Sequence, residues 1–167
     1  CSGIPESLMT DLSATREFIQ SLPKTETHLH IEGALPWELL EKKDPTKYSE
    51  QPAFRGEGFR YDSFEQFESI LIDHALDWFD SPDSYHEAAK LIFSKQVEQN
   101  VKYVETSFHA GMMEFLKIPG EEILKAILSA VPSQLEARVF LGISRNAYTP
   151  YLGPLLEEAI EKWDSLA

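Results

Sequence analysis

The spacing of apolar side chains along the 167-residue chain switches between a helical and a strand-like period. Apolar residues recur every three or four positions, the helical spacing, in the stretches 8–22, 63–79, 85–99, 121–135 and 150–166. A shorter helix is expected over 36–41, because proline favours the first turn of a helix and Pro36 stands there. Alternating or continuous apolar runs predict strands at 25–31, 101–108 and 137–144. The stretch 44–61 is rich in Pro, Gly and charge, which predicts a loop or insertion.

The order of these elements indicates an α/β fold with parallel strands. Strands that alternate with helices are typical of parallel βα units. Parallel sheets have both faces covered, and three strands are too few for such a sheet, so this segment is expected to be incomplete by itself. Ser63 is expected to begin one helix, Ser81 or Asp83 to cap the next, and Pro132 to break or kink the helix over 121–135.

The composition of the chain argues against a membrane and against nucleic acid as partners. No stretch approaches the roughly 18 consecutive apolar residues of a membrane span, so no membrane is expected. The formal net charge of −13 argues against nucleic acid, because binding to a phosphate backbone depends on clusters of Lys and Arg. A small molecule remains compatible with this charge.

The single cysteine, Cys1, excludes an internal disulfide and favours a reducing compartment, so a cytoplasmic location is expected. A Cys-Ser-Gly start would also fit a processed lipoprotein or the remnant of a tag.

Two histidines carry the clearest chemical signal. His28 and His30 are two positions apart on an expected strand, so their side chains leave the same face. Gly33 indicates that the strand ends just after them, and Glu32 follows in the loop, where a carboxylate can reach a bound ligand. Two imidazoles that project together can bind one divalent metal. The alternative is a pair of packed or solvent-facing histidines without a metal.

The stretch around this pair resembles the opening signature of the adenosine deaminase family, written PK-x-E-x-H-x-H-[IL]-[ED]-G-[AS]. The matching residues are Pro23, Lys24, Glu26, His28, His30, Ile31, Glu32, Gly33 and Ala34. The strands 101–108 and 137–144 resemble the second and third strands of the family, with Arg145 just beyond the third, where a structural salt bridge is one interpretation. The helices between residues 63 and 99 fall where the family has its active-site gate and first long outer helix.

The resemblance implies the N-terminal portion of a (β/α)8 TIM barrel, with three strands, their helices and an inserted helical gate. Residues 1–167 would then be the N-terminal part of one deaminase domain. The remaining half would lie in the same polypeptide or in a second chain. Family members hold one zinc ion with three histidines and an aspartate, and a zinc-activated hydroxide replaces the 6-amino group of an adenine-type purine with release of ammonia.

The resemblance also implies roles for particular residues. His28 and His30 match the first two zinc ligands, whereas the third histidine, the catalytic glutamate and the metal aspartate come later in the family, so no catalytic residue is expected in this chain. The expected substrate-binding residues are His30, Glu32, Gly33, Phe64 and Phe67. The two phenylalanines would belong to the gate, although ordinary helix packing explains them equally well.

Glu32 also bears on the substrate. Many members that act on adenosine have Asp at this position, whereas Glu is familiar in relatives that act on adenine or on 5′-modified nucleosides. The longer carboxylate reaches into the space of a 5′-hydroxyl, so plain adenosine is not expected to be the best substrate.

The other histidines are given no functional role. His109 is interpreted as a loop residue at the rim of the site, Asp73 and His74 as helix-surface residues, and His86 is left unassigned.

Two alternatives for the function stay open. One is a different metal hydrolase, because phosphoesterases of the polymerase-histidinol phosphatase type also begin with a His-x-His strand. The other is a non-catalytic relative that binds purine without converting it.

Overall fold

The computed structural model describes residues 6–144 and 149–163. Three parallel strands form one sheet in the order β1-β2-β3, with β1 at Lys24–His30, β2 at Val101–His109 and β3 at Glu136–Gly142. The α-helices are α1 (Glu6–Ser21), α2 (Trp37–Lys43), α3 (Phe64–Trp78), α4 (Pro82–Glu98), α5 (Ala110–Leu116), α6 (Gly120–Ser129) and α7 (Leu152–Glu158). A 3-10 helix, η1, covers Ala53–Arg55 in the expected loop, and a π-helix, η2, covers Ala159–Trp163. The expected α/β fold with parallel strands is confirmed.

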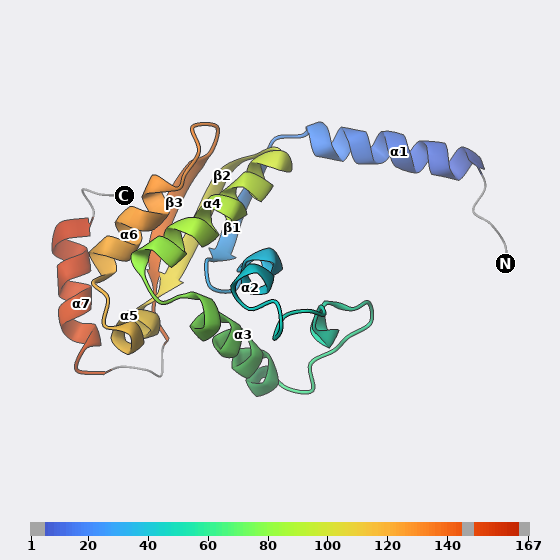
Figure 1. Ribbon diagram of the computed structural model, residues 1–167. Coiled ribbons are helices and arrows are strands. Elements are labelled where there is room, and N and C mark those ends of the chain that lie inside the picture. The colour runs from blue at the N-terminus through green and yellow to red at the C-terminus, as the bar shows by residue number, and fades with distance from the viewer. Residues whose placement is uncertain (1–5, 145–148, 164–167) are drawn as a thin grey trace.

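Helices α4 and α6 cover one face of the sheet (Figure 1). The core between them is apolar: Val104 and Phe108 of β2 meet a helical layer that includes Phe93 of α4 and Ile127 of α6, and all four side chains are buried. Successive residues of a strand point to opposite faces, so the intervening positions of the strands lie on the other face. No described helix covers that face at His28, His30 and Phe140, which are exposed.

The register of the strands aligns residues of the open face near the carboxyl ends of the strands. His30 of β1 lies opposite Ser107 of β2, and Ser107 lies opposite Phe140 of β3. The pairing of β1 with β2 is irregular between Glu26 and Leu29, the segment that carries His28. In barrels of parallel strands the carboxyl ends form the functional face.

Ser81 starts α4, which extends three residues further toward the N-terminus than the apolar period indicated. Its side-chain oxygen accepts a hydrogen bond from the backbone N–H of Ser84, and Oγ of Ser84 accepts one from the backbone N–H of Ser81. This is a capping box, which satisfies two backbone donors at the helix end. Pro82 occupies the first helical position. Of the two expected caps, Ser81 is therefore the correct one.

The chain after β2 differs from the expectation at two places. The helix expected over 121–135, broken or kinked at Pro132, is α6, which already ends at Ser129. Proline disfavours helical backbone in the residue before it, so the helix stops instead of bending. A short helix, α5, directly follows β2 and was not predicted, because seven residues span only two turns and show no clear period.

The two terminal helices differ from their expected form. Helix α1 extends away from the rest of the molecule (Figure 1), and its apolar residues Leu12, Phe18 and Ile19 are exposed. The final helix begins at Leu152 as α7 and continues as the π-helix η2 to Trp163. The predicted end of this helix lies outside the described residues. Among the described helices, none combines the length and the apolar character that a membrane span requires.

Candidate metal and substrate site

The side chains of His28 and His30 converge at the end of β1. Their Nε2 atoms lie 3.1 Å apart and their ring centroids 5.1 Å apart. Two zinc–nitrogen bonds of about 2.0–2.1 Å at a tetrahedral angle place the two nitrogens about 3.3 Å apart. The observed separation fits two ligands of one metal ion.

A serine of the neighbouring strand lies behind this pair. Nδ1 of His30 is 3.0 Å from Oγ of Ser107, its register partner on β2. When Nε2 of a histidine binds a metal, the other ring nitrogen carries the proton, and a hydrogen bond from it fixes the orientation of the ring. Ser107 is placed to accept that hydrogen bond. The backbone N–H of His28 donates to Oε1 of Glu26, which fixes the main chain at the first histidine.

The histidine pair lies in an open groove of about 190 Å³, which is lined by Thr27, His28, Leu29, His30, Glu105, Thr106, Ser107 and Phe140. Within residues 6–144 and 149–163, no further His, Cys, Asp or Glu joins the pair to make a group of three potential ligands. This part of the chain therefore offers two candidate metal ligands, His28 and His30.

Glu32 lies directly beyond β1 and is buried, with only 7% of its surface exposed. Oε1 accepts two hydrogen bonds, from the hydroxyl of Tyr85 at 2.9 Å and from the backbone N–H of His109 at 2.9 Å. A buried carboxylate needs such donors, because its desolvation is costly. Glu32 thereby connects the end of β1 to α4 and to the end of β2.

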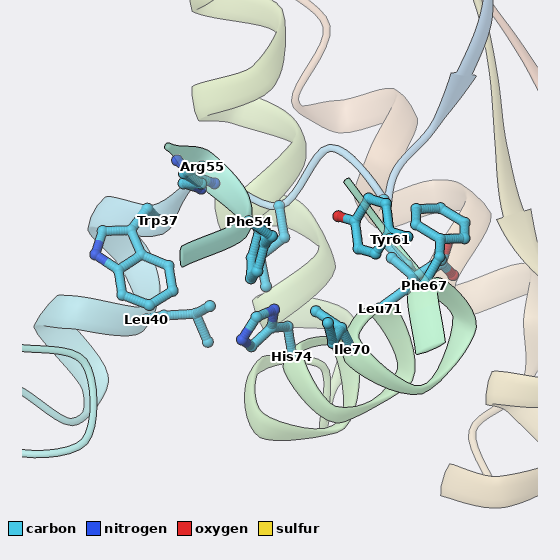
Figure 2. A pocket seen from close by; sticks show the side chains of 12 residues that line it. Trp37, Leu40, Phe54, Arg55, Tyr61, Phe67, Ile70, Leu71 and His74 are labelled. Atoms are coloured by element: carbon cyan, nitrogen blue, oxygen red, sulfur yellow. The ribbon is translucent and has the colours of Figure 1, made fainter. Parts of the chain in front are cut away.

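Glu32 also lines a second hollow, a cavity of about 100 Å³ (Figure 2). Trp37, Phe54 and His74 gather at one end of it, and Tyr61 and Phe67 gather at the other. The full lining is Glu32, Gly33, Leu35, Trp37, Leu40, Phe54, Arg55, Tyr61, Phe67, Ile70, Leu71 and His74. We call this hollow the loop cavity, because the turn after β1 and the long loop before α3 form much of its wall.

The loop cavity contains three of the five expected substrate-binding residues, namely Glu32, Gly33 and Phe67. His30 lines the histidine groove instead, and the two hollows share no residue in their linings. Phe64 lines neither hollow: its side chain is 68% exposed and lies 5.9 Å from the ring of Phe67. The alternative reading of Phe64 as a core residue is wrong.

His74 was interpreted as a helix-surface residue, and the structure corrects this. The side chain is half-buried in the wall of the loop cavity, with its ring 5.4 Å from Phe54 and 5.9 Å from Trp37. Ile70, which also lines the cavity, and the buried Trp78 lie four positions before and after it on α3. Residues four apart share one helix face, so this spacing was the signal that could have identified His74. Asp73, on the neighbouring face, is exposed as expected.

Burial lowers the pKa of His74 below its ordinary value of 6.5. The charges of Lys47 and Arg55 act in the same direction, whereas Asp77 and Asp73 oppose the shift. Between the lowered pKa and 6.5 the unfolded chain binds more protons at this residue than the folded protein does. Stability therefore decreases as the pH falls below 6.5.

The pH dependence predicts a difference between the protein and its His74→Gln variant. From pH 7 down to pH 5, the urea midpoint of the unmodified protein should fall more steeply than that of the variant, which lacks the titrating ring. Between pH 7 and 8 the two midpoints should change in parallel, because the imidazole is neutral in both states there. Equal slopes in the acid range would show that His74 is not protonated on unfolding.

Two further histidines have structural contacts that were not predicted. His109 ends β2 and caps α5, since its Nδ1 accepts a hydrogen bond from the backbone N–H of Gly111. It is therefore a strand-end residue and not a simple loop residue. Nδ1 of His86 lies 2.9 Å from Oγ of Ser129, a contact that joins α4 to α6. Arg145 lies outside the described residues.

Comparisons with known proteins agree on one fold. No protein-family model matches the chain. An adenine deaminase of Pseudomonas putida is 28% identical over 151 residues, which are 87% of this chain and 46% of the relative. The N6-methyl-AMP deaminase of Arabidopsis thaliana superposes with a TM-score of 0.64 at 21% identity, over 89% of this chain and 48% of that protein. An amidohydrolase of Burkholderia ambifaria with bound zinc superposes with a TM-score of 0.69 at 17% identity, over 95% of this chain and 44% of that protein.

The chain spans about half the length of the curated relatives that it matches. The structural neighbours are likewise covered over a little less than half of their length. Their barrel architecture accounts for three adjacent parallel strands with helices on one face and with the histidines on the other. The chain has the fold of the N-terminal half of an adenosine/adenine deaminase-type (β/α)8 barrel.

Proposed function

We propose that this chain is part of an enzyme that hydrolyses the 6-amino group of an adenine-type purine and releases ammonia. The observation that carries this proposal is the 3.1 Å separation of the Nε2 atoms of His28 and His30 at the carboxyl end of the first strand. The fold supports it, as does the similarity to a protein named adenine deaminase. The zinc in one structural neighbour supports a divalent metal at this position.

In this proposal the chain contributes part of the metal site and part of the substrate pocket. His28 and His30 hold the metal through Nε2, and Ser107 keeps the ring of His30 in the orientation that this requires. A divalent metal bound there lowers the pKa of water toward about 7 and so supplies hydroxide near neutral pH. Glu32 offers a carboxylate oxygen to the part of the substrate that enters the loop cavity, and Phe67 supplies an apolar wall.

The remaining ligands and the proton-transfer groups are proposed to come from the other half of the barrel. That half belongs either to the same polypeptide or to a second chain. The open histidine face supports this, because a parallel sheet is normally covered on both faces. We refer to the assembly of both halves as the complete enzyme.

Glu32 points to a preference among 6-aminopurines. Its buried carboxylate is an acceptor and carries no donor when it is ionised, so it favours substrates with an N–H or O–H group at the cavity. We propose that adenine, which carries a ring N–H where a nucleoside carries its sugar, is converted faster than plain adenosine. The relatives named above include a protein named for adenine and one named for a methylated nucleotide, which differ in what stands beyond the purine ring.

Ammonia release by the zinc-loaded complete enzyme tests the proposal. Adenine, adenosine, 5′-methylthioadenosine and AMP are supplied separately, and kcat/KM is compared. We expect conversion of at least one of them, with adenosine not the best. Equal or greater kcat/KM for adenosine would contradict the substrate preference.

Two other outcomes would contradict the deaminase proposal itself. Purine binding in calorimetry without ammonia release would indicate a non-catalytic relative. Hydrolysis of a phosphate monoester without conversion of any purine would indicate the phosphoesterase alternative.

A further inference from the structure

The hydrogen bonds at Glu32 are unevenly divided between its two carboxylate oxygens. Both donors, the hydroxyl of Tyr85 and the backbone N–H of His109, bind Oε1. No described residue donates a hydrogen bond to Oε2. An oxygen without a hydrogen-bond partner is either exposed to solvent or buried and unpaired. Among the described residues, the buried and unpaired side-chain nitrogen or oxygen atom is Nε1 of Trp163, and not Oε2 of Glu32. Oε2 of Glu32 therefore keeps contact with solvent.

Glu32 lines the loop cavity, so a ligand that enters this cavity lies beside its carboxyl group. Its neighbour Gly33 and the aromatic side chains in Figure 2 line the same cavity. With Oε1 fixed by two donors, rotation of the carboxylate would break both hydrogen bonds. Oε2 is thus a fixed acceptor, and its complement is an N–H or O–H donor.

Tyr85 is well suited to hold the carboxylate in this position. Its side chain is fully buried, and its ring lies against that of Phe79 with the centroids 4.4 Å apart. Burial, together with the neighbouring charge of Glu32, raises the pKa of Tyr85 well above its ordinary value of 10.0. The hydroxyl therefore stays protonated and remains a donor.

We propose that Tyr85 is a positioning residue for substrate selection: it fixes Glu32 so that Oε2 accepts a hydrogen bond from an N–H or O–H group of a 6-aminopurine substrate. This rests on the proposed function and goes beyond it by naming a residue on an outer helix, far along the chain, that sets specificity. A substrate with a phosphate at the same place is disfavoured, because phosphate and carboxylate are both anionic acceptors.

The test uses pairs of substrates that differ in one donor: adenine with 9-methyladenine, and adenosine with 5′-deoxyadenosine. The complete enzyme is expected to prefer the donor-bearing member of the pair that it converts. In Tyr85→Phe this preference should fall about 10-fold through KM, with kcat at saturation changed much less, because a hydrogen bond to a charged group is lost while the ring remains. Glu32→Gln should lose the same preference. The amide oxygen accepts from Tyr85 and His109 in place of Oε1, and the NH2 group, which cannot accept a hydrogen bond, takes the place of Oε2.

Tyr48→Phe is the matched control. Tyr48 is another buried tyrosine whose hydroxyl donates to a carboxylate, that of Asp77, and it does not line the loop cavity. The Tyr48→Phe variant should keep the full preference for donor-bearing over donor-blocked substrates. If Tyr48→Phe loses the preference as Tyr85→Phe does, a general loss of packing explains the effect and the inference is wrong.

The outcomes separate this inference from the proposed function. An unmodified enzyme that converts a purine, with a Tyr85→Phe variant that keeps the preference, overturns the inference alone. An unmodified enzyme that converts no 6-aminopurine overturns the proposed function and the inference with it. If Tyr85→Phe does not fold, Glu32→Gln decides, and retention of the preference in that variant overturns the inference.

Discussion

Replacing His28 or His30 with alanine in the complete enzyme is expected to remove the bound metal and to lower kcat/KM by more than about 100-fold. Loss of a partner that merely orients a metal ligand costs about 10–100-fold in metal affinity or activity, and loss of the ligand itself costs more. The two Nε2 atoms lie 3.1 Å apart, so either substitution would remove one of the two metal bonds that we propose for this pair. Metal content is measured by elemental analysis, and activity by ammonia release at saturating zinc.

His86→Ala serves as the control for the loss of a histidine elsewhere. His86 joins α4 to α6 on the covered side of the sheet and lines neither the histidine groove nor the loop cavity. Its replacement should leave metal content unchanged. If the His28→Ala and His30→Ala variants retain one equivalent of metal and full turnover, the metal site lies elsewhere and the proposed function loses its main support.

The convergence of His28 and His30 was predictable from the sequence because its geometry is local. Two residues that are two positions apart on a strand share a face whatever the rest of the fold does. The adjacent Gly33 indicated the end of the strand, and the strand itself ends at His30. The spacing of such a histidine pair can therefore be recognised in a single sequence, and it is part of the motif that resembles the known family.

The setting of Glu32 was not predictable because its partners come from distant segments. Tyr85 lies 53 positions away and His109 lies 77 positions away. In the sequence, Tyr85 is one more apolar residue near the start of a helix, and nothing local shows that its hydroxyl meets a carboxylate. The donor from His109 is a backbone N–H, which has no sequence signature at all. Such contacts are set by the packing of α4 on the sheet.

The gate residues illustrate a second limit. Helical period placed both Phe64 and Phe67 on α3 correctly, yet only Phe67 reaches the loop cavity. Residues three apart are neighbours on a helix, but Phe64 is at the first turn, where the helix has no covering element. The period of apolar residues in a sequence predicts which face of the helix a side chain lies on. It does not predict whether another part of the protein packs against that face.

The two faces of the sheet differ in how they are covered and in their polarity. The face beneath α4 and α6 is apolar and closed, and the opposite face carries His28, His30 and Glu105. In a closed barrel that second face becomes the interior, where water access is restricted and charges interact more strongly. The polar residues on the open face are therefore suited to the proposed site, in which further strands would close the barrel around them.

The second large effect concerns the closed face: Phe93→Ala is expected to lower the free energy of unfolding by about 3–5 kcal/mol. Phe93 is fully buried on α4, in the layer between this helix and the sheet. The substitution removes a large apolar side chain from water-excluded packing and leaves a cavity that the surrounding side chains fill only in part. A typical domain is stable by about 5–15 kcal/mol, so this loss is a large part of the total.

Phe64→Ala is the matched control, because it makes the same change on a helix at a side chain that is 68% exposed. Its effect should stay within about 0.5 kcal/mol, as for other surface substitutions. Urea unfolding of the complete enzyme, followed by circular dichroism, should show a lower midpoint for Phe93→Ala with an unchanged slope. Because α4 also carries Tyr85, Phe93→Ala should reduce the preference for donor-bearing over donor-blocked purines. Its effect on metal binding by His28 and His30 on β1 should be smaller. Equal stability of the two alanine variants would mean that α4 is not held to the sheet by this apolar layer, and the fixed position of Glu32 would then need another explanation.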